Sequence, residues 1–181
     1  MVWLTGLPAS GKSTLARALE RRLFGNGGSP VLLDGDTLRA GLNGDLGFSV
    51  GDRSENIRRL AEVATHLARN GHIAIVAAVS PSREDRAAAR RIADTAFREI
   101  YIATPAEVCE SRDPKGHYAK ARAGSLPAFT GIGKDYQPPE TSELALDTSS
   151  RSVGEATDEI EQMLRRTGVL FDEVVDLAAN I

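Results

Sequence analysis

The chain alternates between short, almost wholly apolar runs and longer segments whose apolar residues recur every three or four positions. The short runs are VWLT (2–5), VLLD (31–34), IAIVAAV (73–79), IYIA (100–103) and, more weakly, LALD (144–147). A strand that is buried on both faces of a parallel sheet reads as such a continuous apolar run. The pattern therefore predicts a parallel five-stranded sheet.

Helical periodicity fills the gaps between these runs. Leu15, Leu19 and Leu23 recur at i+4 after the first run. After the second, apolar residues spaced by three or four positions extend over residues 57–67, and Gly71 lies where a C′ glycine ends a helix. An alternation of strand and helix predicts a three-layer α/β domain. In such domains ligands bind beyond the carboxyl ends of the strands.

Two stretches interrupt the alternation. Residues 41–51 (GLNGDLGFSVG) are rich in glycine and predict no regular element. Residues 111–139 hold four prolines, many charges and little apolar periodicity. Loops of this length in compact domains are typically functional or disordered, so we expect the second stretch to form a lid.

The C-terminal part predicts one amphipathic helix that closes the domain. This helix spans residues 153–166, and its expected inward-facing residues are Val153, Ala156, Ile160, Met163 and Leu164. We therefore expect a single domain over residues 1–170. The remaining tail, residues 171–181, is expected to form a short extra helix.

Composition narrows the class of protein. A length of 181 residues fits one domain, and 41% hydrophobic residues suffice for a core. The net charge is −3 and the basic residues are dispersed, which argues against a nucleic-acid partner and favours small anionic ligands. No apolar stretch approaches the ~18 residues of a membrane span, and we expect no signal peptide. Cys109 is the only cysteine, which suits the cytoplasm.

A complete phosphate-binding motif follows the first strand. Residues 6–13 read GLPASGKS, which matches G-x-x-x-x-G-K-[ST] between a predicted strand and a predicted helix. The glycines let backbone N–H groups point at phosphate oxygens, Lys12 would reach the β- and γ-phosphates, and Ser13 would hold Mg²⁺. This context argues against a glycine-rich turn that matches by chance. The residues expected to bind ATP here are Gly6, Leu7, Pro8, Ala9, Ser10, Gly11, Lys12, Ser13 and Thr14.

Two aspartates follow the second strand. In the sequence DGD, Asp34 and Asp36 are expected on the same side of an extended chain. A carboxylate at this edge can take the proton of an attacking hydroxyl or hold a metal-bound water. Asp36 could instead cap the next helix, a position that aspartates favour. Beside a phosphate loop we favour catalytic roles for Lys12, Asp34 and Asp36.

Arginine and aromatic side chains further along suit an anionic, aromatic acceptor. Arg39 and Arg53 can bind phosphate or sulfate bidentately, and Asn56, one helical turn after Arg53, can hydrogen-bond a nucleobase. Phe48 lies in a polar, glycine-rich loop, where it could stack on a base or anchor the loop. Phe129, in AFTGI, could form a second aromatic wall.

The predicted lid is basic, with Arg112, Lys115, Lys120 and Arg122 in RDPKGHYAKAR. A lid that closes over polyphosphate needs such charges, although a solvated helix has a similar composition. We expect Arg112 and Lys115 to contact ATP, and Lys115 to contact the acceptor as well.

The third strand ends in Val79 and Ser80, at the edge where the reaction is expected. The simplest interpretation makes Ser80 a turn residue whose backbone lines the acceptor pocket. We place both residues in that pocket and Ser80 among the candidate catalytic residues.

Taken together, these blocks resemble the adenylylsulfate kinase family. They are GLPASGKST (6–14), DGDTLRAGLNGDLGFSVGDRSENIRR (34–59), SPSREDRAAAR (80–90), TPAEVCESRDPKGHYAKARAG (104–124), and FTGI with YQPPE. The phosphate loop alone marks only the large P-loop kinase superfamily. The blocks in this order are specific, and the resemblance extends from residue 2 to about residue 164.

The resemblance implies that the γ-phosphoryl group of ATP is transferred to the 3′-hydroxyl of adenosine 5′-phosphosulfate, with Mg²⁺ required. This reaction yields 3′-phosphoadenosine 5′-phosphosulfate and ADP, and it belongs to sulfate assimilation. The resemblance also implies that Phe48 and Phe129 sandwich the acceptor's adenine. Arg39 and Arg53 would hold its phosphosulfate, with Asn56 nearby.

A phosphoserine intermediate at Ser80 is also implied by the resemblance. We favour direct in-line transfer instead, because two bound nucleotides need no covalent intermediate. The sequence offers no histidine or lysine beside Ser80 to activate its hydroxyl.

Two other functions stay open from the sequence. One is a small-molecule or nucleoside kinase of the same fold, and the other is a non-catalytic nucleotide-binding module of a larger sulfate-activation protein. A homodimer is the family expectation. The first strand begins at the start of the chain, so the protein either stands alone or was cut from a fusion with a sulfurylase.

Overall fold

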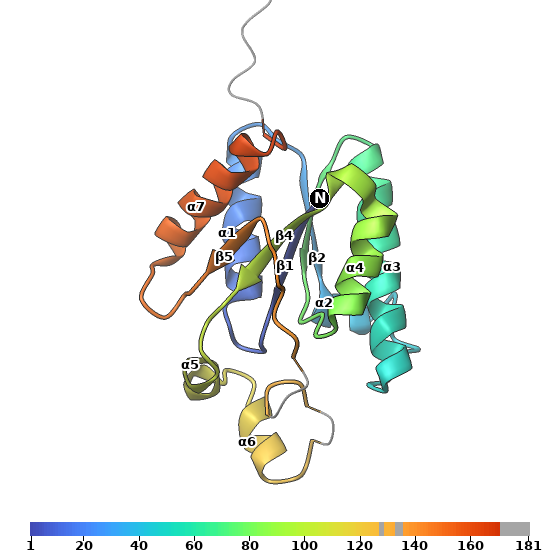
Figure 1. The fold of residues 1–181 in the computed structure, drawn as a ribbon, viewed down its shortest axis with the longest axis vertical. Coiled ribbons are helices and arrows are strands. Elements are labelled where there is room, and N and C mark those ends of the chain that lie inside the picture. The colour runs from blue at the N-terminus through green and yellow to red at the C-terminus, as the bar shows by residue number, and fades with distance from the viewer. Residues whose placement is uncertain (127–128, 133–135, 171–181) are drawn as a thin grey trace, which may run out of the picture.

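A five-stranded parallel sheet forms the middle layer of the molecule (Figure 1). The computed structural model describes residues 1–126, 129–132 and 136–170. The strand order is β2-β3-β1-β4-β5, and each neighbouring pair is parallel. This confirms the predicted sheet. The strands are β1 (Val2–Gly6), β2 (Pro30–Asp34), β3 (Ile73–Ala77), β4 (Arg98–Ile102) and β5 (Leu144–Leu146).

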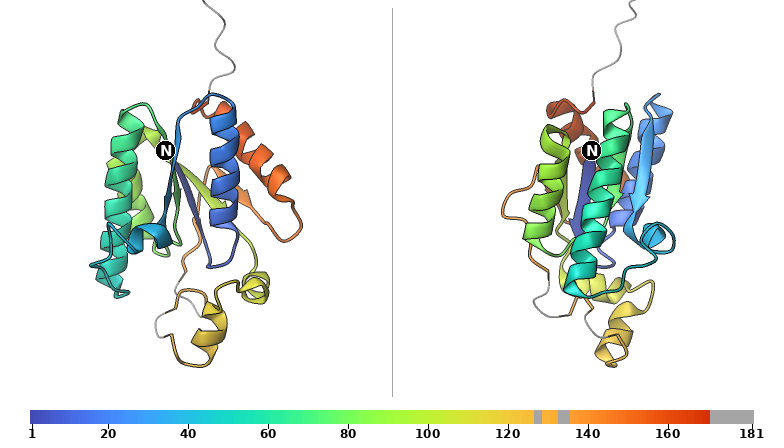
Figure 2. Two further views of the ribbon diagram at one scale, coloured as in Figure 1. Left: turned by 180° about the vertical axis from the view of Figure 1, so that it is seen from behind. Right: turned by 90° about the vertical axis from the view of Figure 1, so that its right-hand side faces the viewer.

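Helices cover both faces of the sheet, as the views of Figure 2 show. On one face lie α1 (Lys12–Gly25) and α7 (Val153–Arg166), and on the other α3 (Val50–Arg69) and α4 (Arg83–Ala93). Alternate residues of β1 explain the two cores. Val2 and Leu4 pack with α1 and α7, whereas Trp3 packs with α3 and α4. The three-layer α/β architecture is therefore confirmed. The shorter helices are α2 (Gly35–Arg39), η1 (Asp94–Ala96), α5 (Ala106–Arg112) and α6 (His117–Arg122).

Serine side chains fix the starts of the three long helices that follow loops. Ser49, Ser82 and Ser152 are the N-caps of α3, α4 and α7, and each accepts a hydrogen bond from the backbone N–H at the N3 position. Ser152 and Glu155 complete a capping box. Gly71, with φ of +86°, follows the end of α3 as the periodicity predicted.

One inward-facing residue was predicted wrongly. Val153 is 43% exposed, whereas the other four predicted residues of α7 are buried. Val153 is the first residue of the helix, at the carboxyl edge of the sheet, where it lines the cavity described below. Amphipathic periodicity gives the side of a helix but does not reveal that its first turn extends past the sheet.

The two interrupting stretches differ in structure. Residues 41–45 form turns, and regular structure resumes when α3 begins at Val50. The 111–139 stretch contains the end of α5 and all of α6, which lie beyond the carboxyl ends of the strands (Figure 1). The helix expected at residues 171–181 lies outside the described residues, and the domain boundary at residue 170 stays a prediction. Within the described ranges, no helix has the length and apolar character to cross a membrane.

Candidate active site

A cavity of about 940 Å³ opens at the carboxyl ends of the strands. It lies between the phosphate loop, α2, the first turns of α3 and the lid segment that carries α6. Most of the residues selected from the sequence line this one cavity. They are Pro8, Ala9, Gly11, Lys12, Ser13, Thr14, Asp34, Asp36, Arg39, Phe48, Arg53, Asn56, Val79, Ser80, Arg112, Lys115 and Phe129.

The phosphate loop is held in shape by its glycines and by neighbouring threonines. Gly6 has φ of +149°, and a Cβ there would lie 2.6 Å from the carbonyl oxygen of Ile102. No larger residue therefore fits at this position. The carbonyl of Ser10 accepts hydrogen bonds from the hydroxyls of Thr104 (3.1 Å) and Thr148 (3.0 Å). The loop is thus braced from the ends of β4 and β5.

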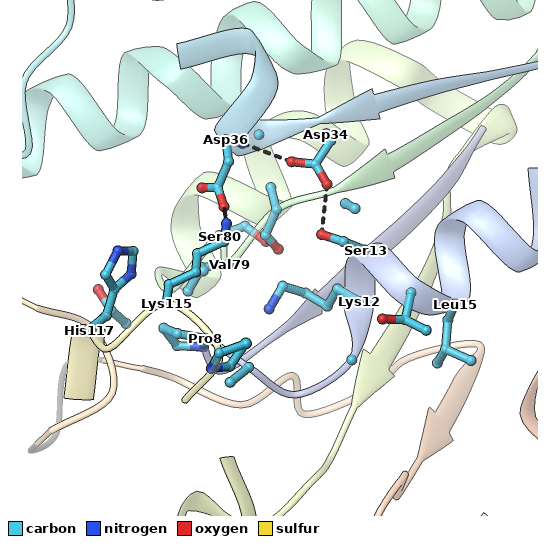
Figure 3. Close-up of a pocket in the computed structure, with 18 of the residues that line it drawn as sticks. Pro8, Lys12, Ser13, Leu15, Asp34, Asp36, Val79, Ser80, Lys115 and His117 are labelled. Atoms are coloured by element: carbon cyan, nitrogen blue, oxygen red, sulfur yellow. Dashed lines mark hydrogen bonds and ion pairs between the residues drawn. The ribbon is translucent and has the colours of Figure 1, made fainter. Parts of the chain in front are cut away.

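Lys12 is the first residue of α1, and its side chain folds back over this loop (Figure 3). Its ammonium group donates to the carbonyls of Gly6 (3.0 Å) and Leu7 (2.6 Å), and the side chain is only slightly exposed. Burial lowers the pKa of Lys12 to about 8. Gly6 and Leu7, predicted as ATP-binding residues, thus hold this lysine in the free protein, and an incoming phosphate would offer it stronger acceptors.

Ser13 and Asp34 place a hydroxyl and a carboxylate side by side next to Lys12. The hydroxyl of Ser13 donates to Asp34 Oδ2 at 2.6 Å. The other carboxylate oxygen of Asp34 accepts from the backbone N–H of Asp36 at 3.0 Å, which makes Asp34 the N-cap of α2. The expectation of an extended DGD segment, with Asp36 as the alternative cap, was therefore wrong. The helix begins at Gly35, because Asp34 supplies the cap two residues before Asp36.

Asp36 reaches across the cavity to the lid. Its carboxylate forms an ion pair with Lys115, and both side chains are largely exposed (Figure 3). Asp36, on α2, and Lys115, just before α6, thus meet at the mouth of the cavity. Lys115 was predicted to contact both ATP and the acceptor. It lines the same cavity as the phosphate loop and as Arg39 and Phe48, which is consistent with that prediction.

The lid contacts the phosphate loop directly. Tyr118 of α6 is buried, and its hydroxyl donates to the carbonyl of Pro8 at 3.1 Å. The ring of Phe129 packs edge-on against Tyr118, with centroids 5.0 Å apart. Of the four basic lid residues, Arg112 and Lys115 line the cavity. Lys120 is exposed, and Arg122 pairs with Glu110.

Arginine and phenylalanine side chains gather on the other side of Asp36. The guanidinium of Arg39 lies 4.7 Å from the ring centroid of Phe48, and Arg53 donates to the Phe48 carbonyl at 3.1 Å. Arg53 also donates to the hydroxyl of Thr130, next to Phe129. Partial burial, and then the charge of Arg53, lower the pKa of Arg39. Two cations held this close favour an anionic ligand.

Asn56 presents its carboxamide to the same part of the cavity. Its Oδ1 accepts from Nδ2 of Asn43 at 3.0 Å, and both side chains are buried. This contact occupies the amide oxygen and directs the NH₂ group of Asn56 away from Asn43, on a residue that lines the cavity. The arrangement leaves a hydrogen-bond donor for a ligand.

Ser80 and Val79 form the wall beyond β3. Ser80 is buried and has φ of +39°. Its hydroxyl accepts from the indole of Trp3 at 3.1 Å and donates to Thr5 at 2.9 Å. Thr5 in turn donates to the carbonyl of Val79 at 2.8 Å. The Ser80 hydroxyl thus has partners in the sheet, and the structure places neither lysine nor histidine beside it within the described hydrogen bonds.

Sequence reasoning missed Tyr118 and Thr148. Thr148 bonds to the guanidinium of Arg112 (2.8 Å) as well as to the phosphate loop. It lies two residues after the end of β5, so the rule that ligands bind at the carboxyl ends of parallel strands could have found it. Tyr118 had a weaker signal, as a lone aromatic among lid charges. Cys109 is buried, and burial raises the pKa of its thiol, which makes it a poor nucleophile.

Comparison with known proteins places these features in a family. The family model described as adenylylsulphate kinase matches residues 1–147. The chain belongs to the adenylylsulfate kinase family. It is 48% identical over 166 residues to the adenylyl-sulfate kinase of Bacillus licheniformis, covering 91% of this chain and 84% of that protein. The predicted family, the P-loop kinase fold and the phosphotransferase class are thereby confirmed.

Two further relatives come from Mycobacterium tuberculosis. The bifunctional enzyme CysN/CysC of strain H37Rv is 52% identical over 166 residues, which cover 90% of this adenylylsulfate kinase domain. The chain spans only 27% of the length of that relative. The structure of the APS kinase CysC, solved in complex with AMPPNP and APS, superposes with a TM-score of 0.88 at 51% identity. That match covers 91% of this chain and 96% of CysC.

Proposed function

We propose that this adenylylsulfate kinase transfers the γ-phosphoryl group of ATP to the 3′-hydroxyl of adenosine 5′-phosphosulfate. The products are 3′-phosphoadenosine 5′-phosphosulfate and ADP. One observation carries the proposal. A single cavity joins a complete phosphate loop to a second subsite of two arginines and two phenylalanines, with Asp36 between them. A second nucleotide with an anionic tail fits the second subsite.

ATP would bind at the phosphate loop. Backbone N–H groups at the start of α1 would surround the β-phosphate, and Lys12 would exchange its loop carbonyls for β- and γ-phosphate oxygens. Arg112 is fixed by two hydrogen bonds to Thr148, so its guanidinium is positioned on the ATP side of the cavity. The charge of Lys12 would stabilise the transferring group where negative charge develops.

The acceptor would occupy the subsite around Phe48. The exposed ring of Phe48 and the ring of Phe129 could receive the adenine between them. Arg39 and Arg53 would bind the phosphosulfate, and the NH₂ group of Asn56 would donate to the base or to the anion. Neutral sugars would leave this charge and aromatic surface unused, which favours the nucleotide acceptor over a small-molecule acceptor.

Mg²⁺ fits the oxygen ligands beside the phosphate loop. Ser13 Oγ and Asp34 Oδ2 lie 2.6 Å apart and are two neighbouring protein oxygens. Mg²⁺ prefers such a site, in which one or two protein oxygens are combined with phosphates and water. Ser13 and Asp34 would hold the ion, directly or through water. Mg²⁺ bound there would neutralise phosphate charge during transfer.

Direct transfer is the mechanism that these contacts favour. Asp36 lies between the two subsites and can accept the proton of the 3′-hydroxyl once Lys115 turns from it to phosphate. Ser80 already donates its proton to Thr5 and accepts from Trp3, so it is poorly placed as a nucleophile. Ser80 and Val79 would instead shape the wall of the acceptor subsite.

The wider setting is also a proposal. The assembled set of Lys12, Ser13, Asp34 and Asp36 favours an active enzyme over a non-catalytic nucleotide-binding module. We propose a homodimer in the cytoplasm, and a sulfurylase as a fusion or partner. The bifunctional relative, of which this domain spans only part, is consistent with the fused arrangement.

The test is an assay of ADP release with ATP, Mg²⁺ and adenylylsulfate, compared with adenosine, other nucleosides and gluconate. We expect turnover with adenylylsulfate at low concentration and little with the other acceptors. Preference for an unsulfated nucleoside or a sugar would overturn the proposed acceptor. Absence of turnover with every acceptor, by a folded protein that binds ATP, would favour the non-catalytic module.

A further inference from the structure

Arg86 is a buried arginine that the catalytic proposal does not use. It lies on α4, its side chain is 3% exposed, and it does not line the cavity in the described part of the chain. Each nitrogen of its guanidinium nonetheless makes a short hydrogen bond to a different segment. Nε donates to Glu99 of β4 (2.7 Å), Nη1 to the carbonyl of Ser80 (2.6 Å) and Nη2 to the carbonyl of Gln137 (2.7 Å).

The segment around Ser80 forms the wall of the acceptor subsite. Ser80 has a positive φ, a conformation that costs free energy for a residue other than glycine. Its carbonyl accepts from Arg86 while its hydroxyl is bonded to Trp3 and Thr5. Arg86 therefore holds the backbone of this wall from behind.

The segment around Gln137 leads from the lid back to the sheet. The N–H of Gln137 donates to the carbonyl of Pro81 (2.9 Å), and the Gln137 side chain accepts from the N–H of Arg83 (3.0 Å). The hydroxyl of neighbouring Tyr136 lies 3.0 Å from that of Thr5, the residue that also bonds Ser80. Besides these direct contacts, two side chains bridge the end of the lid and Ser80 itself: Arg86, which bonds the carbonyls of Gln137 and Ser80, and Thr5, which bonds Tyr136 and Ser80.

The geometry requires an arginine at this position. The planar guanidinium presents donors in three fixed directions, whereas a lysine ammonium on a flexible stem cannot reach the same three acceptors together. Its buried charge is balanced by Glu99, which is itself 7% exposed. Such a pair is costly to bury, and replacing it with apolar residues is often neutral for stability. A contribution to folding stability therefore does not account for the buried pair of Arg86 and Glu99.

We propose that Arg86 is a positioning residue, which couples the returning end of the lid to the Ser80 wall and so sets the acceptor subsite for adenylylsulfate. The inference rests on the proposed function of that subsite. It predicts that loss of the Arg86 contacts selectively weakens use of the acceptor, because the phosphate loop is braced separately by Thr104 and Thr148.

The experiment compares Arg86→Lys with Arg90→Lys. Arg90 is on the same helix and pairs with Glu143, and at 3.6 Å also with Glu99, but it contacts neither Ser80 nor Gln137 in the described hydrogen bonds. For Arg86→Lys we expect kcat/KM for adenylylsulfate to fall about tenfold or more, the loss typical of a hydrogen bond to a charged group. We expect the KM for ATP to stay within about twofold. Arg90→Lys should leave both kinetic constants near wild type, although both variants lower the Tm.

Tyr136→Phe tests the second connection without disturbing a buried charge, and it decides the question should Arg86→Lys fail to fold. It should raise the KM for adenylylsulfate severalfold and leave ATP use unchanged. Equal losses for both substrates, or a lowered Tm with wild-type kinetics, would overturn the positioning role. A wild-type enzyme that ignores adenylylsulfate would instead refute the proposed function, so the two failures are distinguishable.

Discussion

The ammonium group of Lys12 is buried against the carbonyls of its own loop, and this gives the enzyme a pH dependence. Burial lowers the pKa of Lys12 to about 8. In the free enzyme Lys12 is therefore positively charged below that pH and neutral above it. Phosphate binds the charged form. We therefore expect the affinity for ATP to be constant below about pH 8 and to fall by about tenfold per pH unit above it.

This prediction is checked by measuring the Kd of a non-hydrolysable ATP analogue from about pH 7 to about pH 9. The matched control is Lys12→Ala, which should bind more weakly and without the decline above pH 8. It should also lower kcat by roughly a hundredfold or more, because the charge on the transferring group loses its partner. An unchanged slope in Lys12→Ala would assign the titration to another group.

Phe48 is predicted to act on one substrate alone. Its side chain is 64% exposed beside the guanidinium of Arg39, so truncation removes little core. Phe48→Ala should weaken adenylylsulfate binding by ~1–3 kcal/mol through lost stacking, with the Tm and the Kd for ATP nearly unchanged. Calorimetric titration of each nucleotide measures the effect. Equal losses for both nucleotides would make Phe48 a loop anchor.

Variants at Asp36 and Ser80 distinguish direct transfer from a route through a phosphoserine intermediate. Asp36→Asn should lower kcat on the order of a hundredfold, because the 3′-hydroxyl loses its proton acceptor. Ser80→Ala should keep substantial activity, with a loss of ~1 kcal/mol in transition-state binding from the contacts to Trp3 and Thr5. Both variants are assayed at saturating substrates. An inactive Ser80→Ala, with a wild-type phosphoenzyme that forms from labelled ATP and passes its label to product, would require the covalent route.

At the scale of elements, the short lid helix α6 depends on contacts outside itself. Six residues are too few for a stable isolated helix. The carboxylate of Asp113 accepts from the N–H groups of His117 (2.7 Å) and Ala119 (3.0 Å), and so replaces missing helical partners. The helix α6 is therefore supported by one acidic side chain at its start and by the contact of Tyr118 with the phosphate loop.

Asp113→Ala should consequently loosen the lid while the sheet stays intact. We expect a local loss of ~0.5–2 kcal/mol, seen as faster hydrogen exchange of the α6 amides and a higher KM for ATP, with little change in Tm. Glu107→Ala, at an exposed site on α5, is the control. A fall in Tm without faster exchange in α6 would contradict this view of the lid.

Elements were predicted well where periodicity was strong. All five strands and the span of α7 follow from the sequence, because buried runs and amphipathic stripes are local patterns. The errors lie at element ends. The exposed Val153 and the capping role of Asp34 both depend on where a helix begins relative to the sheet edge. Short helices such as α6, which are stabilised by tertiary contacts, left little periodic signal.

At the scale of the whole molecule, the parallel sheet explains why the candidate site could be assembled from sequence. The phosphate loop, Asp34 and Val79 each lie at or just beyond the end of a strand, and all parallel strands end at one edge. Contacts that cross between long loops could not be predicted in this way. The pairs Lys115 with Asp36, and Arg86 with Gln137, join segments far apart in the chain, and their meeting depends on how the lid folds back.

The position of Trp3 gives the molecule a built-in optical probe. It is the only tryptophan, it is fully buried against Phe97, and its indole N–H is bonded to Ser80 at the acceptor wall. Its fluorescence should therefore be emitted at short wavelength in the native protein and shift to longer wavelength on unfolding. A ligand that moves the Ser80 wall would perturb this hydrogen bond and change the emission intensity, whereas one confined to the phosphate loop would change it less. Acceptor binding could then be followed in the unlabelled protein.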